Sequence, residues 1–346
     1  MHLRKIYIEL TNKCNLDCSI CYRHSWDEKP QDMSIELFEK LNKNIDDISS
    51  IDTIVLGGIG EPAIAPVIEQ AIVALKKYKI ILTTNALSID NSLMDLIVEN
   101  THMVMISIDG MHDSFLKIRG AILNNVLENA FKISELKKTR GKNLPYIGVQ
   151  CVISKDNIND IFEMIDLANK LNAHILVLAN LIPQTCDNSD KILYTRYENR
   201  NMADLFKKVL SYSSRKGVNI VFPNYELKTE RRCSFIDDNS VFVTAAGEVA
   251  PCYRMSHTYT EYVFGRKKTV LKHSFGNVGS ESLKNIWESR QYVSFREMVR
   301  NNYYPSCIDC DLVEGCDMVK DSSADCYTNS PSCADCLWAR KVTFCP

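Results

Sequence analysis

Three cysteines, Cys14, Cys18 and Cys21, lie within eight residues, shortly after the β-branched and aromatic run at 6–10. Such a run predicts a β-strand. The loop that follows a parallel strand is where open α/β sheets and barrels place their chemistry. Thiolates select zinc, copper(I) or iron–sulfur clusters over harder ions. We therefore interpret residues 14–21 as a metal-binding loop.

The number of thiolates in this loop separates two kinds of site. A closed structural zinc site and an ordinary four-iron cubane each take four protein ligands. Three thiolates on a cubane leave one iron open to another molecule. Zinc held by the three cysteines and His24 is the competing interpretation, and the loop alone leaves both open.

Composition bounds the class of protein. The chain has 346 residues and 45% hydrophobic content, so it can bury a substantial core and is long enough for two domains. Its net charge of −2 gives no global field that would favour nucleic acid or an anionic membrane. We expect no signal peptide and no membrane span, and hence a cytoplasmic protein. Fourteen cysteines in a reducing compartment favour metal ligation over disulfides.

Strands and helices alternate through the first half of the chain. Predicted strands cover 6–10, 53–56, 80–83, 103–108, 146–152 and 174–178. Predicted helices begin at Ser34 as N-cap, cover 65–76, 92–99 and 126–137, and include 161–171. This alternation predicts an α/β fold with a parallel sheet and helices on its outer face. Periodicity alone does not separate an open sheet from a partial barrel.

Polar residues and glycines follow three of these strands, and an arginine lies a little farther on. They are Gly57, Gly58, Gly60 and Glu61 after the second strand, Asn85 after the third, Ser107 and Asp109 at the end of the fourth, and Arg119. Ser107 and Asp109 share a face because residues two apart in a strand do. Taken singly, a tight turn or a solvated surface residue explains each of them.

The last third of the chain carries nine cysteines. A predicted hairpin at 241–252 lies between Cys233 and Cys252, and two Cys-x2-Cys pairs follow, at 307–310 and 333–336. Paired cysteines indicate a metal domain, and a zinc ribbon is the alternative. A polar loop at 183–190, a helix at 202–212 and a strand at 218–222 precede this region. The isolated Cys151 and Cys186 are expected to be small buried hydrophobes.

The Cys-x3-Cys-x2-Cys spacing resembles the signature loop of the radical S-adenosylmethionine (SAM) superfamily. The resemblance implies a [4Fe-4S] cluster whose open iron chelates SAM, reductive cleavage to a 5′-deoxyadenosyl radical, and a partial (β/α)6 TIM-like barrel over 1–182. One departure is Ile20, where the family usually has an aromatic residue. We expect Tyr22 to take over packing near the adenine.

The same resemblance assigns roles at the strand ends. Gly57, Gly58, Gly60 and Glu61 match the segment that holds the methionine ammonium, and Asn85 lies at the same rim. Ser107 and Asp109 are expected to reach the ribose hydroxyls. Arg119 resembles the arginine that pairs with the SAM carboxylate, a contact that suits the guanidinium fork.

The C-terminal cysteines resemble the SPASM extension of radical SAM peptide maturases, which holds two auxiliary [4Fe-4S] clusters. We expect this domain at 231–346, after a bridge at 183–230. Lys320 stands where the pattern has a cysteine. We therefore expect Cys233, Cys252 and Cys326 on one cluster with Cys333 as candidate fourth ligand, and Cys307, Cys310, Cys316 and either Cys336 or Cys345 on the other.

Segments 21–26 and 329–340 resemble the maturases associated with tungsten-cofactor oxidoreductases of the aldehyde:ferredoxin type. This implies a maturase that acts on a peptide or protein, with the tungsten enzyme or its associated peptide as candidate partners. It also implies a low-potential electron donor such as ferredoxin or flavodoxin. Two other classes compete: an enzyme of nucleotide or pterin cofactor biosynthesis, and a non-catalytic zinc protein that binds nucleic acid or protein. Neutral charge and the strand-end residues disfavour the last.

Overall fold

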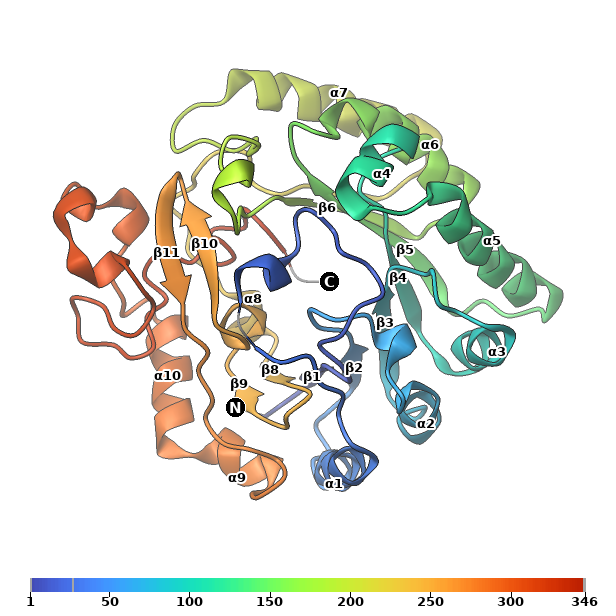
Figure 1. The fold of residues 1–346 in the computed structure, drawn as a ribbon, viewed down its shortest axis with the longest axis horizontal. Helices are drawn as coiled ribbons and strands as arrows, with labels where there is room; N and C mark the ends of the chain where they lie inside the picture. Colours follow the sequence, from blue (N-terminus) through green and yellow to red (C-terminus); the bar gives the residue numbers. More distant parts are fainter. Residues whose placement is uncertain (1, 27, 345–346) are drawn as a thin grey trace.

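The computed structural model describes residues 2–26 and 28–344 (Figure 1). The strands are β1 Lys5–Ile8, β2 Thr53–Leu56, β3 Lys79–Thr84, β4 Met103–Ser107, β5 Tyr146–Ile153, β6 Ile175–Asn180, β7 Ile220–Val221, β8 Ser240–Val243, β9 Val249–Ala250, β10 Tyr259–Val263 and β11 Arg266–Val270. The helices are α1 Ile35–Asp46, α2 Ile68–Ala74, α3 Asn91–Asn100, α4 His112–Arg119, α5 Leu123–Thr139, α6 Ile161–Lys170, α7 Arg200–Lys216, α8 Ser234–Asp237, α9 Leu283–Glu288 and α10 Arg290–Arg300.

The main sheet has nine strands in the order β7-β6-β5-β4-β3-β2-β1-β8-β9. Strands β1 to β6 follow one another in chain order and pair in parallel. The helices that connect them form an outer arc around the curved sheet (Figure 1). The expected partial (β/α)6 barrel is confirmed. Parallel pairing brings all the carboxyl ends of these strands to one rim, where the cysteine loop lies.

Side chains on opposite faces of the strands belong to two different hydrophobic cores. Ile6 and Ile8 of β1 belong to the large cluster between sheet and helices, whereas Tyr7 points to the other face. There the Tyr7 ring stacks on Phe235 of α8, with ring centroids 4.7 Å apart, and Phe242 of β8 packs beside them. Aromatic residues from the C-terminal region therefore pack against the inner face of the barrel.

Local signals account for several boundaries. The Ser34 hydroxyl accepts the Leu37 amide and caps α1, as predicted. The expected helix at 65–76 is shorter, because a 3-10 turn at Pro62–Ile64 takes the chain into α2. Between β4 and β5 the structure has two helices where one was expected. The missed helix, α4, buries Phe115 and Ile118 and ends at Gly120, whose φ of 66° suits glycine.

The C-terminal region is joined to the barrel by hydrogen bonds between strands. The predicted hairpin is present as β8 and β9, but β8 also pairs in parallel with β1. The predicted strand at 218–222 is the short β7, which extends the other edge of the sheet. The β10–β11 hairpin and the helices α9 and α10 were not predicted. The boundaries at 182 and 230 stay predictions.

None of the helices in the described parts of the chain combines the length and the apolar character that a membrane span needs.

Candidate functional site

A cavity of about 180 Å³ lies at the carboxyl ends of the barrel strands. It brings together ten residues that were predicted from sequence: Cys14, Cys18, Cys21, Tyr22, Gly58, Gly60, Glu61, Asn85, Ser107 and Arg119. They come from the loop after β1 and from the ends of β2, β3 and β4, together with α4. Gly57 and Asp109 do not line this cavity.

Short-range hydrogen bonds shape the cysteine loop. The Cys21 amide donates to the Cys18 carbonyl at 2.9 Å, and this turn leads into the 3-10 helix Tyr22–Ser25. His24 Nε2 lies 2.8 Å from the same carbonyl oxygen. The Ser19 amide donates to the Ile118 carbonyl of α4 at 2.8 Å. The His24 contact therefore stabilises the cysteine loop. The hydrogen bond to α4 fixes the position of the loop relative to Arg119.

The glycine-rich turn after β2 packs closely against the cysteine loop. A Cβ added to Gly60 would lie 2.2 Å from the Thr11 carbonyl oxygen and 2.5 Å from that of Lys13, so a side chain does not fit. The Glu61 amide donates to the Lys13 carbonyl at 2.8 Å. Close backbone approach is what glycine permits. Gly60 therefore sets the distance between the turn and the thiols.

Glu61 is fully buried beneath the rim. Its carboxylate accepts hydrogen bonds from the Thr84 hydroxyl at 2.6 Å, the Asn85 amide at 2.7 Å and the Ala63 amide at 3.0 Å. Burial raises the pKa of Glu61, and these donors oppose that rise. Asn85 Nδ2 in turn donates to Asn15 Oδ1 in the cysteine loop at 2.7 Å. Glu61 thus holds the end of β3 in place against the loop.

Asp109 differs from expectation. Its side chain is completely buried, Oδ2 accepts from Arg119 Nε at 2.6 Å, and Oδ1 accepts from the Val152 amide at 2.7 Å. The cavity is therefore reached by Ser107 and Arg119, while Asp109 lies behind them. Burial alone would lower the pKa of Arg119, but the charges of Asp109 and Cys18 raise it above its ordinary value. Asp109 therefore holds Arg119 in the structure, and its expected contact with the ribose stays a prediction.

Sequence reasoning missed one part of the wall. Tyr253 lines the cavity from the C-terminal region, and its hydroxyl donates to the Gly58 carbonyl at 3.0 Å. The Tyr22 ring lies edge-on to Tyr253 and Tyr259, with centroids 6.4 and 4.8 Å away. The one available signal was that Tyr253 directly follows Cys252. The adenine contact of Tyr22 stays a prediction.

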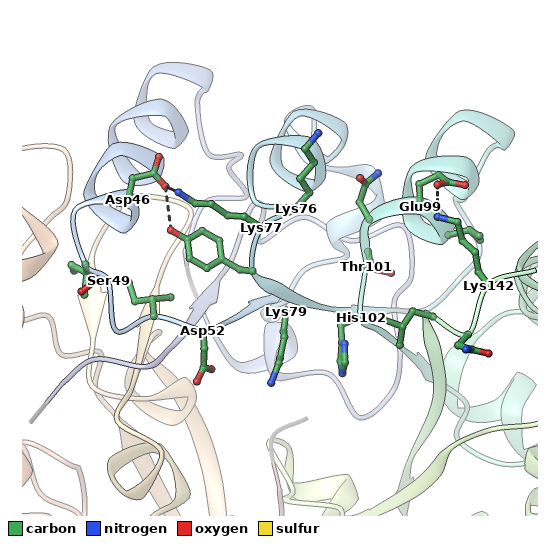
Figure 2. Close-up of a pocket in the computed structure, with 17 residues that line it drawn as sticks. Asp46, Ser49, Asp52, Lys76, Lys77, Lys79, Glu99, Thr101, His102 and Lys142 are labelled. Atoms are coloured by element: carbon green, nitrogen blue, oxygen red, sulfur yellow. Dashed lines mark hydrogen bonds and ion pairs between the residues drawn. The ribbon is translucent and has the colours of Figure 1, made fainter.

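A hollow of about 990 Å³, larger than the cavity beside the cysteine loop, lies at the other end of the barrel (Figure 2). Asp52, Lys79 and His102 line it next to the amino ends of β2, β3 and β4. Figure 2 also shows the ion pairs Asp46–Lys77 and Glu99–Lys142 at its border. Size does not mark the reactive site here, because the thiols and strand-end residues all lie at the opposite rim.

Four cysteines of the C-terminal region cluster beside the barrel. Burial raises the pKa of the Cys233 thiol, and the nearby thiols of Cys252 and Cys336 add to the effect. Burial likewise raises the pKa of Cys333, with Cys336, Cys252 and Cys233 contributing. These four cysteines therefore lie close together, which is one complete set of ligands for a cubane.

A second group contains Cys307, Cys316 and Cys326, and Cys310 lies three residues after Cys307 in the chain. Burial raises the pKa of Cys307 to about 12, and Cys326 and Cys316 are among the neighbours that add to it. Cys310 follows in the same 3-10 turn, where its amide donates to the Cys307 carbonyl at 3.4 Å. Cys336 lies near Cys233 and Cys326 near Cys307, which differs from the expected placement of Cys326, and the assignment of ligands to clusters stays a prediction. Cys345 lies outside the described residues.

These thiols suit iron–sulfur clusters better than single metal ions. The described cysteines are all free. Within the parts of the chain that the structure describes, no three His, Cys, Asp or Glu side chains are placed to hold one metal ion. A cubane distributes its ligands over four irons, so they need not converge on one point. Three thiols beside a cavity and two groups of four fit one open and two closed clusters.

Comparisons with known proteins agree with this arrangement. The Radical SAM superfamily profile matches residues 8–168, and the SPASM iron-sulfur cluster-binding domain profile matches 233–311. A curated relative, the tungsten-containing aldehyde ferredoxin oxidoreductase cofactor-modifying protein of Pyrococcus furiosus, is 36% identical over 99% of this chain and 97% of its own. The probable GTP 3′,8-cyclase of Pyrococcus abyssi is 26% identical, over 58% of this chain and 65% of its own.

Solved structures extend the agreement to the fold. SuiB of Streptococcus suis bound to SAM has a TM-score of 0.64 at 16% identity, covering 97% of this chain and 77% of SuiB. SuiB bound to its precursor peptide SuiA has a TM-score of 0.62 at 16% identity, covering 97% and 76%. The chain therefore belongs to the radical SAM superfamily, whose [4Fe-4S] cluster and SAM together supply a 5′-deoxyadenosyl radical, and it carries a C-terminal SPASM domain for auxiliary iron–sulfur clusters.

Proposed function

We propose that this radical SAM enzyme is a maturase that modifies a peptide or protein connected with a tungsten-containing aldehyde:ferredoxin-type oxidoreductase. The observation that carries the proposal is the Pyrococcus furiosus relative, which matches across the barrel and both groups of C-terminal cysteines.

In this proposal, Cys14, Cys18 and Cys21 hold the cluster that binds SAM. The cavity beside them supplies contacts to SAM: backbone groups of Gly58 and Gly60 for the ammonium, Ser107 for the ribose and Arg119 for the carboxylate. The groups Cys233, Cys252, Cys333, Cys336 and Cys307, Cys310, Cys316, Cys326 hold the auxiliary clusters. Electrons come from a low-potential protein such as ferredoxin or flavodoxin, and the enzyme works in the cytoplasm.

A peptide is the proposed substrate class because SuiB, which shares the fold, binds a precursor peptide. The protein's own task in radical chemistry is to position the substrate and exclude water. The half-buried side chains of Tyr22, Tyr253 and Trp338 pack together beside the cavity, the last two from the C-terminal region. Such packing keeps a reactive carbon away from solvent.

The test is anaerobic turnover. The reconstituted protein is incubated with SAM, a reductant and either the tungsten enzyme or peptides encoded with it. We expect 5′-deoxyadenosine together with a polypeptide about two hydrogens lighter per new bond, because hydrogen-atom abstraction is followed by one-electron oxidation. Absence of 5′-deoxyadenosine under all conditions would contradict the enzyme assignment.

A second candidate is an enzyme that acts on the cofactor itself, a nucleotide or pterin. The names of two relatives favour it, since one is called cofactor-modifying and the other a probable GTP cyclase. The same incubation separates the two candidates. Consumption of a nucleotide or pterin with no change in polypeptide mass would transfer the assignment to this second function.

A further inference from the structure

A second cavity of about 130 Å³ adjoins the SAM cavity. Ile20, Tyr22 and Tyr253 line both cavities, so these three residues lie between the two spaces. The second cavity lies at the carboxyl ends of β5 and β6, and its far wall comes from the C-terminal segment, including Trp338 and Phe344. It is therefore next to the place where the radical would form.

The two cavities differ in charge. Arg23, Glu61 and Arg119 line the SAM cavity. No Asp, Glu, Lys, Arg or His is among the described residues that line the second one, and most of its wall is aliphatic or aromatic. Without a cation, this space gives no compensation for the desolvation of a phosphate or carboxylate. Without an anion, the second cavity also gives no compensation for the desolvation of an ammonium group.

Two buried amide side chains, those of Asn180 and Gln184, line the second cavity. Asn180 and Gln184 are each 2% exposed. Asn180 Nδ2 donates to the carbonyls of Asn224 at 3.0 Å and Val342 at 2.9 Å, and Gln184 Nε2 donates to the Ile182 carbonyl. These bonds leave Asn180 Oδ1 and Gln184 Oε1 as acceptors that no described residue fills. Buried acceptors are nearly always paired, so their natural complement is an N–H donor.

The volume limits what can enter. At about 30 Å³ for each water, the cavity holds the equivalent of roughly four waters. Pockets for whole drug-sized ligands measure about 300–1,000 Å³. One amino-acid side chain fits this volume, and the absence of a cation among the described lining residues disfavours the phosphates of a nucleotide.

We propose that this cavity receives a single uncharged, N–H-bearing side chain of the peptide substrate, a carboxamide or an indole, which donates to Asn180 and Gln184. The proposal rests on the proposed function, because it identifies which part of a peptide reaches the radical. Tyr22 and Tyr253 then position that side chain against the SAM cavity, while the apolar wall excludes charged residues and water.

The test measures binding to the iron-loaded, SAM-bound protein by saturation-transfer NMR. The probes are N-acetyl amino-acid N-methylamides with Gln, Met, Glu and Lys side chains, and GTP. We expect the Gln probe to bind about fivefold more tightly than Met, which has a similar size but no N–H. The Glu and Lys probes should bind about tenfold more weakly still. GTP should not displace the Gln probe.

The second measurement is the binding of the same probes to a variant with a charge at position 184. Gln184→Glu should reverse the preference, so that the Lys probe binds more tightly than the Gln probe. Gln291→Glu makes the same change on the exposed face of α10 and serves as the control, with the wild-type preference expected. Equal binding of the Gln and Met probes, displacement by GTP, or the same preference in Gln184→Glu as in Gln291→Glu would overturn the inference.

These outcomes are separate from failure of the proposed function. The binding measurements need no turnover, and the wild-type probe series does not depend on whether a variant folds. Probe binding without the expected preference, in a protein that cleaves SAM and alters a polypeptide, would overturn the inference alone. Cleavage of SAM with turnover of a nucleotide or pterin would overturn the peptide function.

Discussion

His257 Nε2 lies 3.0 Å from Glu9 Oε2, although the two residues are 248 positions apart. His257 comes from the C-terminal region, and Glu9 directly follows β1. On its other side His257 Nδ1 lies 2.8 Å from Glu28, and the Trp26 ring packs edge-on to the imidazole at 4.4 Å. Glu9 also accepts from the Ile59 amide in the glycine-rich turn at 3.1 Å. One imidazole therefore connects the segments on both sides of the cysteine loop to that turn.

The first prediction is a pH dependence of stability that originates at His257. Burial alone would lower its pKa, but the charges of Glu9 and Glu28 and the hydrogen bonds to them raise it to about 9. Because the folded pKa exceeds the unfolded value of about 6.5, the contribution is complete below about pH 6.5 and is lost as the pH rises through about 9. Its upper limit is about 3 kcal/mol.

Anaerobic thermal unfolding of wild type and His257→Gln checks this. We expect the gap between their melting temperatures to be widest near pH 6 and to close above pH 9. His273→Gln is the control, since burial lowers the pKa of His273 and no carboxylate opposes it. A gap that does not change between pH 6 and 10 would show that His257 contributes only packing.

The second prediction separates the two metal regions. Replacing Cys14, Cys18 and Cys21 together by Ala should abolish release of 5′-deoxyadenosine and lower iron from about twelve to about eight per chain. The expected ligands of the auxiliary clusters all lie from residue 233 onward, and the triple variant leaves them unchanged, so these clusters should still bind iron. Iron analysis and quantification of 5′-deoxyadenosine under reducing conditions measure both effects. Zinc in place of iron in the wild type would contradict the radical SAM assignment of the loop.

The third prediction distinguishes the two possible cysteine groupings. In the structure Cys336 lies with Cys233, so Cys233→Ala, Cys336→Ala and the double variant should each lose the same cluster, about four irons. Pairing Cys336→Ala with Cys307→Ala should remove about eight. Cys186→Ala is the control and should lose none, because this isolated thiol is exposed; the expectation that it is buried was wrong, whereas Cys151 is buried. Loss of about eight irons in the Cys233/Cys336 variant would restore the grouping expected from sequence.

How much the sequence predicted depends on the range of the interaction. Ser34 caps α1 through a contact three residues away, and the alternation of strands and helices follows from local periodicity, so both were predictable. The rim residues were predictable because parallel strands end at one edge. The neighbours of Cys326 and Cys336 were not predictable because they depend on how a segment with little regular structure folds back, which spacing does not encode.

Long-range contacts explain why the other site residues and contacts were not predicted from the sequence. Tyr253 and His257 reach the site only because β8 pairs with β1, and no local pattern announces a strand pairing over more than 200 residues. Asp109 lies two residues beyond the end of β4, as predicted, but it does not line the cavity. Which of its neighbours it would meet was decided by α4, the helix that periodicity did not reveal and that ends at Arg119.

The last prediction concerns Asp109 and Arg119 as a pair. Arg119→Ala should weaken SAM binding by about 1.5–3 kcal/mol, since it removes a charge-assisted contact to the carboxylate. Asp109→Ala should cost a similar amount, because it releases Arg119 from its 2.6 Å contact. If Asp109 acts only through Arg119, the double variant should be no weaker than the single ones.

Titration calorimetry of SAM with the iron-loaded proteins measures all three, and iron content confirms that the clusters remain. A ribose contact made by Asp109 itself would instead give additive losses, about 3–6 kcal/mol in the double variant. Lys117→Ala is the control, because this cation on the same helix pairs with Asp156 at the surface. Unchanged SAM affinity in both single variants would mean that Arg119 does not contact the SAM carboxylate and that the pair serves the fold alone.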